Sequence, residues 1–234
     1  MLEIVGLSKR FGKKCAVDDL SFSVAPGETV GLLGPNGAGK STTFLALAGF
    51  LRPDAGEIRW NGALLGPDRG RTIALIPETP EVYPMLTVWE HLVFVAKSSR
   101  LAAGWEQRAV ALLERLGIAG ERNTVGQALS KGMRQKTLIA ATVLAENPVF
   151  LLDEPTIGLD PQGQRELREM LAELRADGTA ILISTHMLEQ AQQLCDRIVV
   201  IKDGRFVAAG SFDELRERVG REDAEDVFLE LTRA

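Results

Sequence analysis

The sequence predicts an α/β fold with three parts: a parallel β-sheet core that carries a phosphate loop, a small N-terminal antiparallel β subdomain, and an all-helical insertion. Three observations support this prediction. The octapeptide Gly34–Ser41 reads Gly-Pro-Asn-Gly-Ala-Gly-Lys-Ser and lies between a strand pattern and a helix pattern. Strand signals nearly vanish over residues 87–146, and strands alternate with helices again afterwards. We expect one domain over residues 1–234, with a helical subdomain at approximately 87–146.

Short strands separated by turns are predicted for the first part of the chain. Apolar residues gather over Leu2–Val5 and Leu20–Val24, and Glu28–Leu33 is typical of a buried strand. An Asn-Gly pair inside Gly56–Leu65 predicts a hairpin, because both residues accept the positive φ angles of a tight turn. Thr72–Ile76 is expected to form a further strand.

The octapeptide Gly34–Ser41, called the phosphate loop below, has the residue types that bind nucleotide phosphates. Its glycines let backbone N–H groups approach the phosphates, and Lys40 can reach the β- and γ-phosphate oxygens. The hydroxyl of Ser41 suits Mg²⁺, and the helix predicted for Thr42–Phe50 directs its N-terminus at the anion. The alternative is a glycine turn with a purely structural role.

The block over residues 87–146 has apolar residues at helical spacing, as in Val88, Leu92 and Val95. Its last helix is expected to begin after Ser130, whose hydroxyl suits an N-cap, and to run to the end of the block. Beyond it, strands and helices are predicted for Val149–Leu152, Pro161–Arg175, Ala180–Ser184 and Met187–Leu194, followed by a hairpin turning at Asp203-Gly204 and two short amphipathic helices.

Two consecutive acids, Asp153 and Glu154, end the apolar strand that begins at Val149. Parallel strands present such carboxylates at the carboxyl edge of the sheet, where Asp153 suits Mg²⁺ and Glu154 can orient an attacking water as general base. The alternative is a pair of exposed acids that close a strand before Pro155.

His186 follows the buried strand predicted for Ala180–Ser184, and a parallel arrangement would deliver it beside Glu154. Its imidazole could donate a hydrogen bond to a γ-phosphate, and the alternative is a histidine that caps the strand through local hydrogen bonds. His91 falls inside a helical pattern and is predicted to be structural.

Composition narrows the class of protein. The formal net charge of −5 argues against nucleic acid as the main partner, since such surfaces are usually basic. Cys15 and Cys195 form no C-x-x-C pair and no secretory pattern begins the chain, so we expect a reducing, cytoplasmic location. Apolar stretches such as Leu138–Ala145 are far shorter than the ~20 residues needed to cross a bilayer. Any membrane function must come from a partner.

The order of motifs resembles the nucleotide-binding subunit of ATP-binding cassette (ABC) transporters over essentially the whole chain. The phosphate loop is followed by a helical insertion, Leu129-Ser130-Lys131-Gly132, the strand ending in Asp153-Glu154, Gly158-Leu159-Asp160-Pro161, and Ser184-Thr185-His186. The resemblance implies a RecA-like parallel sheet and a Mg²⁺-dependent ATPase. It also implies that two copies, or this chain and a similar ATPase subunit, close head to tail on two ATP molecules. The pair would lie on the cytoplasmic face of a membrane and drive a separate permease.

The resemblance also implies roles for particular residues. Lys40, Glu154 and His186 would be catalytic, and Ser41, Asp153 and Glu78 would face Mg²⁺. Asp160 would lie at the dimer seam. A signature segment, Ser130, Lys131, Gly132 and Met133, would meet the γ-phosphate bound by the partner copy. The ATP-binding residues would be Phe11, Gly34, Pro35, Asn36, Gly37, Ala38, Gly39, Lys40, Ser41 and Thr42.

Three segments depart from the commonest pattern of this family. Lys131-Gly132-Met133 replaces Gly-Gly-Gln, which puts a cation beside the phosphate site of the partner. Glu78 stands where a glutamine is usual, and a solvated loop acid is the alternative to a ligand. Phe11 replaces the commoner tyrosine; it would stack on adenine, with a core phenylalanine as the alternative. The first two variants resemble ATPases of small two-component export systems, which favours export.

Residues 81–87 resemble the surface that docks a permease helix, although they could equally belong to the core of the helical subdomain. The sequence favours this function over three others. A soluble ABC ATPase acting on ribosomes or DNA would usually fuse two cassettes or insert a long coiled coil. A regulatory ATP-binding module would release no phosphate. A small-molecule phosphotransferase would need an acceptor pocket, for which the sequence gives no sign.

Overall fold

A computed structural model describes residues 1–221 and 223–233, which form two compact units. The first unit consists of Met1–Leu75, Pro148–Glu154 and Leu174–Ala234, and the second of Ile76–Asn147 and Pro155–Glu173. The second unit therefore contains the helical block predicted for residues 87–146. Each unit is described by itself below.

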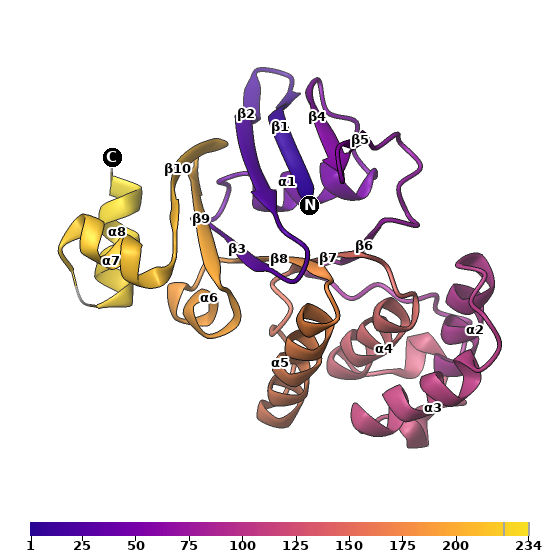
Figure 1. Ribbon diagram of the computed structural model, residues 1–234. Coiled ribbons are helices and arrows are strands. Elements are labelled where there is room, and N and C mark those ends of the chain that lie inside the picture. Colours follow the sequence, from indigo (N-terminus) through magenta and orange to yellow (C-terminus); the bar gives the residue numbers. More distant parts are fainter. Residues whose placement is uncertain (222, 234) are drawn as a thin grey trace. The chain divides into compact units, whose positions relative to one another are not determined.

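Two sheets make up the first unit within the described residues (Figure 1). The smaller is antiparallel, with strand order β2-β1-β4-β5. The turn between β4 and β5 is the predicted Asn-Gly hairpin, and φ is 50° at Asn61 and 79° at Gly62. The strands of this sheet are β1 (Leu2–Phe11), β2 (Lys14–Val24), β4 (Ala55–Trp60) and β5 (Ala63–Leu64).

The larger sheet has strand order β10-β9-β3-β8-β7-β6. Strand β3 pairs in parallel with β8 and β9, β7 pairs in parallel with β8, and β10 is antiparallel to β9. Every residue of β3, β7 and β8 is buried, which explains why these strands are nearly continuous in apolar residues. The strands are β3 (Thr29–Leu33), β6 (Ile73–Ile76), β7 (Val149–Asp153), β8 (Ala180–Thr185), β9 (Arg197–Lys202) and β10 (Arg205–Gly210).

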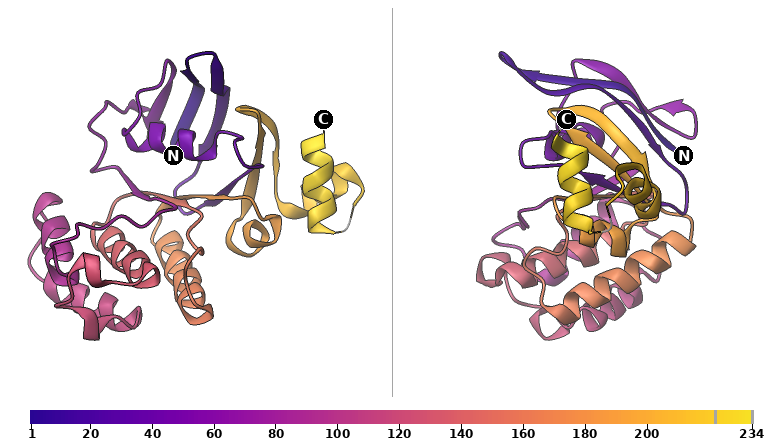
Figure 2. Two further views of the ribbon diagram at one scale, coloured as in Figure 1. Left: turned by 180° about the vertical axis from the view of Figure 1, so that it is seen from behind. Right: turned by 90° about the vertical axis from the view of Figure 1, so that its left-hand side faces the viewer.

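Helices cover both faces of the larger sheet. Helix α1 (Lys40–Ala48) lies between the two sheets, and its Phe44 and Leu47 are fully buried in their shared core (Figure 1). The opposite face packs against three helices near β9 and β10, as both views of Figure 2 show. These are α6 (Leu188–Leu194), α7 (Phe212–Val219) and α8 (Ala224–Arg233). The sheet is thus packed on both faces where β3 ends, because Leu32 lies in one of these clusters and Leu33 in the other.

The second unit is helical, as predicted. Helices α2 and α3 both pack against α4, and Arg115 of α3 pairs with Glu166 and Glu173 of α5. Ser130 caps α4 as expected, because its Oγ accepts a hydrogen bond from the N–H of Met133 at 3.2 Å. The elements are α2 (Val88–Ser98), α3 (Trp105–Arg115), two 3₁₀ turns (Ala119–Glu121 and Gly126–Ala128), α4 (Lys131–Leu144) and α5 (Pro161–Ala176).

Several helix boundaries differ from the prediction by one or two residues, and two of these differences have a clear cause. Helix α4 ends at Leu144 instead of Glu146, since φ at Glu146 is 55° and this left-handed conformation cannot continue a helix. Helix α1 begins at Lys40, two residues before the predicted start, because Gly39 forms its N-cap. Lys40 and Ser41 therefore lie in the first turn of α1.

Candidate functional site

The register of three parallel strands brings the predicted site of the first unit together. Strand β8 lies between β3 and β7, with Thr185 beside Leu33 and Ser184 beside Asp153. The phosphate loop after β3, Glu154 after β7 and His186 after β8 therefore leave the sheet at one edge. The predicted placement of His186 beside Glu154 is confirmed.

The phosphate loop needs glycine at two positions because the protein itself leaves no room for a side chain. A Cβ on Gly34 would lie 2.4 Å from the carbonyl oxygen of Ile201, and a Cβ on Gly39 would lie 2.4 Å from that of Ala16. Gly39 also has a φ of 104°. Gly37 differs, because its φ is 83° but no atom lies within 4 Å of an added Cβ. Sequence reasoning attributed these glycines to phosphate contact alone and missed the packing at Gly34 and Gly39.

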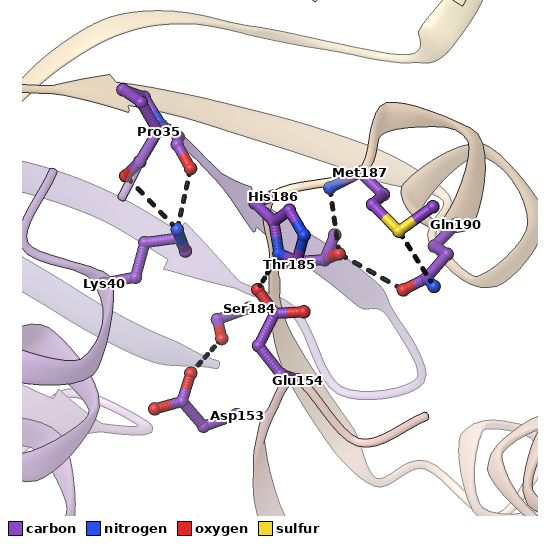
Figure 3. A network of polar contacts seen from close by, with 10 residues as sticks. Pro35, Lys40, Asp153, Glu154, Ser184, Thr185, His186, Met187 and Gln190 are labelled. Carbon is purple, nitrogen blue, oxygen red and sulfur yellow. Dashed lines mark hydrogen bonds and ion pairs between the residues drawn. The ribbon is translucent and has the colours of Figure 1, made fainter. Parts of the chain in front are cut away.

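Lys40 is buried beneath the loop. Its Nζ donates to the carbonyl oxygens of Gly34 at 2.7 Å and Pro35 at 3.3 Å (Figure 3). Ser41 is exposed and Thr42 half-buried in the same helical turn, and Asn36 is exposed on the loop. The ammonium and the first N–H groups of α1 therefore lie together at one helix N-terminus, which favours an anion.

Asp153 is held by a partner that sequence reasoning missed. The hydroxyl of the fully buried Ser184 donates to Oδ1 of Asp153 (Figure 3). The sequence places Ser184 in the segment Ser-Thr-His but does not indicate a role for it. The signal that could have found it is the register of two adjacent parallel strands, each of which ends in a polar residue.

Glu154 lies in an unusual backbone conformation. Its φ is 49°, in the left-handed region that residues other than glycine seldom adopt, and its N–H donates to the carbonyl oxygen of Ser184 at 3.1 Å. The side chain is buried, and Oε1 lies 2.7 Å from Nδ1 of His186, whose own side chain is 45% exposed. Glu154 is therefore not an exposed acid that closes a strand. A carboxylate at this distance requires Nδ1 to carry the proton of the imidazole ring.

The donor chemistry of Ser41 and Asp153 fits Mg²⁺. A hydroxyl and a carboxylate are hard oxygen ligands, and the Ser184 hydroxyl donates to Oδ1 of the Asp153 carboxylate. Within residues 1–221 and 223–233, no group of three or more His, Cys, Asp or Glu side chains could enclose a metal. Glu78 lies in the second unit and is exposed, so its role stays a prediction.

Phe11 is not a core phenylalanine, because its side chain is 51% exposed. It pairs with Lys14 at the end of the β1–β2 hairpin, and the same β2 strand presents Ala16 to the phosphate loop. The Nζ of Lys9 lies 5.6 Å from the Phe11 ring centroid and 3.0 Å from Oδ1 of Asp54. The ring is thus held at the surface, and stacking on adenine remains a prediction.

The signature segment is described within the second unit. Lys131 is exposed, Met133 is half-buried, and a Cβ on Gly132 would lie 2.9 Å from the carbonyl oxygen of Gly158. Glycine at position 132 therefore lets the first turn of α4 pack closely against residue 158. A role for this segment toward a partner's phosphate stays a prediction.

Asp160 has local contacts at the start of α5. Its Oδ1 accepts from the N–H of Gly163 at 2.9 Å and lies 3.5 Å from Nζ of Lys136. The Gly163 N–H, followed by the Lys136 ammonium, holds the pKa of Asp160 below its usual value. The predicted dimer-seam role is untested beside this helix-capping role.

His91 is structural, as predicted. It is buried, its Nδ1 lies 2.7 Å from the carbonyl oxygen of Thr87, and its Nε2 accepts from the N–H of Tyr83 at 2.9 Å. Both ring nitrogens therefore serve the loop before α2. Among the described residues, no helix is long and apolar enough to span a membrane.

Comparisons with known proteins agree with the predicted fold and family. A family model described as ABC transporter matches residues 17–157. The chain is 36% identical to the ABC-type transporter ATP-binding protein EcsA of Bacillus subtilis, covering 100% of this chain and 97% of that protein. It is 39% identical to the Nod factor export ATP-binding protein I of Ralstonia nicotianae, covering 92% and 68%.

A solved ATP-binding subunit of an ABC transporter has the same fold, with a TM-score of 0.93, 38% identity and 99% of each chain covered. The α/β core, the antiparallel subdomain and the helical insertion are those of an ABC ATPase. From the family match, the relatives and this fold, it follows that the chain belongs to the ATP-binding subunits of ABC transporters.

Proposed function

We propose that two copies of this chain close head to tail on two ATP molecules, hydrolyse them with Mg²⁺, and thereby power export through a separate membrane permease. The observation that carries the proposal is the contact between Glu154 Oε1 and His186 Nδ1, 2.7 Å apart, at the sheet edge where the phosphate loop begins. Residues 1–234 would act as one ABC ATPase domain whose signature subdomain lies at approximately 87–146. Export is supported by a relative whose name is Nod factor export ATP-binding protein I.

In this mechanism the phosphate loop and Lys40 bind the phosphates, and Phe11 stacks on the adenine. Ser41 and Asp153 would hold Mg²⁺, which when bound neutralises phosphate charge. Each acid is oriented by one residue at the end of β8: Ser184 orients Asp153, and His186 orients Glu154.

Glu154 would orient the attacking water and accept its proton. His186 engages one carboxylate oxygen and leaves the other for that water. Because Nδ1 of His186 faces Glu154, a hydrogen bond from this ring to the γ-phosphate must come from Nε2. Such a donor exists only when the ring is an imidazolium, so donation to phosphate requires a second ring proton.

The second copy would complete the site. Ser130 is the N-cap of α4, and Lys131, Gly132 and Met133 lie in its first turn. A helix N-terminus favours the γ-phosphate held by the other copy. Each ATP then contacts both copies, so that closure depends on nucleotide. Asp160 is proposed at the seam between them.

The permease would dock on the second unit, at the inner face of the membrane. Tyr83 and Met85 are 56% and 74% exposed, so neither belongs to the subdomain core, and Phe94 is 51% exposed. The Tyr83 and Phe94 rings meet edge to face with centroids 5.6 Å apart. Exposed apolar side chains of this kind suit a groove for a partner helix.

The test is Glu154→Gln. It keeps the size of the side chain and removes the base, so we expect phosphate release to fall by a factor of about 100 or more while ATP still binds. Size-exclusion chromatography with light scattering should then show a stable dimer with ATP and Mg²⁺ and a monomer without them. Unchanged turnover would rule out Glu154 as the general base. A monomer under both conditions would contradict the dimer.

A further inference from the structure

The segment that carries His186 has a set of polar contacts that the mechanism above does not use. The hydroxyl of Thr185 donates to Oε1 of Gln190 at 3.3 Å and accepts from the N–H of Met187 at 3.1 Å. The Nε2 of Gln190 lies 3.3 Å from Sδ of Met187 (Figure 3). One glutamine of α6 therefore contacts the residue before His186 and the residue after it.

The contacts of Gln190 involve the segment between β8 and α6, where the backbone is neither strand nor helix. His186 follows the last residue of β8, and Met187 precedes α6 with an extended backbone, φ −110° and ψ 112°, and no side-chain cap. Thr185 is 1% exposed, which anchors one end of the segment in the sheet. Met187 is 41% exposed, so its position relies more on local contacts.

Both ends of the Gln190 amide are needed for these contacts. A thioether sulfur can only accept, so the Gln190 nitrogen must face Met187, and its oxygen then faces the Thr185 hydroxyl. A glutamate at this position would keep the acceptor, lose the donor and add a charge. The contacts thus suit glutamine by chemistry and not merely by size.

We propose that Gln190 is a positioning residue for His186: by holding Thr185 and Met187, it keeps Nδ1 of His186 on Oε1 of Glu154. As far as it concerns hydrolysis, this inference rests on the proposed function. The geometric part does not, because the contact between His186 and Glu154 can be observed without turnover.

The sequence offers a direct probe, since the chain has two histidines, His91 and His186. In ¹⁵N-labelled protein, long-range ¹H–¹⁵N spectra distinguish protonated from bare ring nitrogens. We expect His186 to show a fixed tautomer with the proton on Nδ1. In Gln190→Ala this signal should move toward a mixture of tautomers, while His91 in the second unit stays unchanged as an internal reference.

Three further variants sharpen the test. Gln192→Ala changes an exposed glutamine on the same helix and should leave the His186 signal unchanged. Met187→Leu removes the sulfur acceptor at similar volume, and Gln190→Glu removes the donor, so each should shift the signal partly. These two milder changes keep the proposal testable if Gln190→Ala fails to fold.

Activity gives the second readout. Because only the orientation of Glu154 is disturbed, Gln190→Ala should lower kcat about ten-fold and leave the KM for ATP within about two-fold. An unchanged His186 spectrum in Gln190→Ala, or an equal change in Gln192→Ala, would overturn the proposal. A spectral shift in a chain whose wild type releases no phosphate would support the positioning and refute the proposed ATPase function.

Discussion

Two helix N-termini are proposed to bind phosphate, and they differ in whether a side chain caps their first N–H groups. Helix α1 begins after Gly39, which has no side chain to cap it, whereas α4 begins after Ser130, whose Oγ accepts the N–H of Met133 at 3.2 Å. The glycine at α1 is required by contact with Ala16, while the serine at α4 serves its own helix. The first end therefore has no side-chain cap of its own, whereas the second has one.

The self-capped end can still bind an anion. A serine hydroxyl that accepts from a backbone N–H keeps its own proton, and this proton can be donated to a phosphate oxygen. Ser130 could therefore cap α4 and contact the partner's ATP at the same time. This difference between the two ends predicts different consequences of substitution.

The largest effect is expected at α1, with Gly39→Ala. The added Cβ would lie 2.4 Å from the carbonyl oxygen of Ala16 at a residue with φ 104°. Strain and overpacking should together lower the free energy of unfolding by about 2–5 kcal/mol, as measured by urea denaturation without nucleotide. Gly37→Ala is the matched control, since it has φ 83° but open space, and it should cost about 1–2 kcal/mol. Equal losses would show that backbone strain alone demands these glycines.

At α4 the expected effect is smaller and separates capping from function. Ser130→Ala should lower the free energy of unfolding by about 1 kcal/mol through the lost cap. Ser211→Ala is the matched control, because Ser211 caps α7 by the same contact to the N–H of Glu214 at 3.2 Å. If Ser130 also contacts ATP, phosphate release should fall about ten-fold or more in Ser130→Ala alone. Equal phosphate release by Ser130→Ala and Ser211→Ala would show that Ser130 caps α4 and does not contact ATP.

These two helix ends also show what the sequence could and could not predict. The Ser130 cap depends on neighbours three residues away, so the local pattern was enough to predict it. The crowding at Gly39 comes from Ala16, and that at Gly34 from Ile201, so neither can be seen in a local window. The position of the glycine-rich loop between a strand and a helix could nonetheless be predicted, because the motif itself specifies the backbone.

The contacts of Asp153, Glu154 and His186 depend on the pairing of β7 with β8, which the sequence predicts only in part. Placement of His186 beside Glu154 followed from two apolar strands assumed to be parallel and adjacent, which the structure confirms. The bond from Ser184 to Asp153 required the register, which hydrophobic pattern alone does not specify for a strand buried on both faces. The end of α4 was not predicted because Glu146 adopts a positive φ, and a glutamate in the sequence does not indicate this conformation.

A smaller effect is expected from Lys131→Ala, which tests the charge that α4 adds at its first turn. Lys131 is exposed, so its attraction for ATP held by a partner copy is screened by salt over about 10 Å at 0.1 M. ATP-driven dimerisation of Glu154→Gln should weaken several-fold with the added Lys131→Ala at low salt and hardly at all at 0.5 M salt. Lys97→Ala, an exposed lysine at the end of α2, is the control. Unchanged dimerisation at low salt would remove Lys131 from the ATP site.

The smallest effect is expected at Asp160, and its pH dependence separates a capping role from a dimer role. The N–H of Gly163 and the ammonium of Lys136 lower the pKa of this carboxyl, so its stabilisation is present above its usual pKa of 3.8. That stabilisation is lost as the pH falls through the lower, folded-state value. Asp160→Asn should therefore slightly lower the urea midpoint at pH 7, and the difference should shrink when the pH is lowered below 3.8. A loss of ATP-driven dimerisation at pH 7 without any change in midpoint would instead assign Asp160 to the seam between two copies.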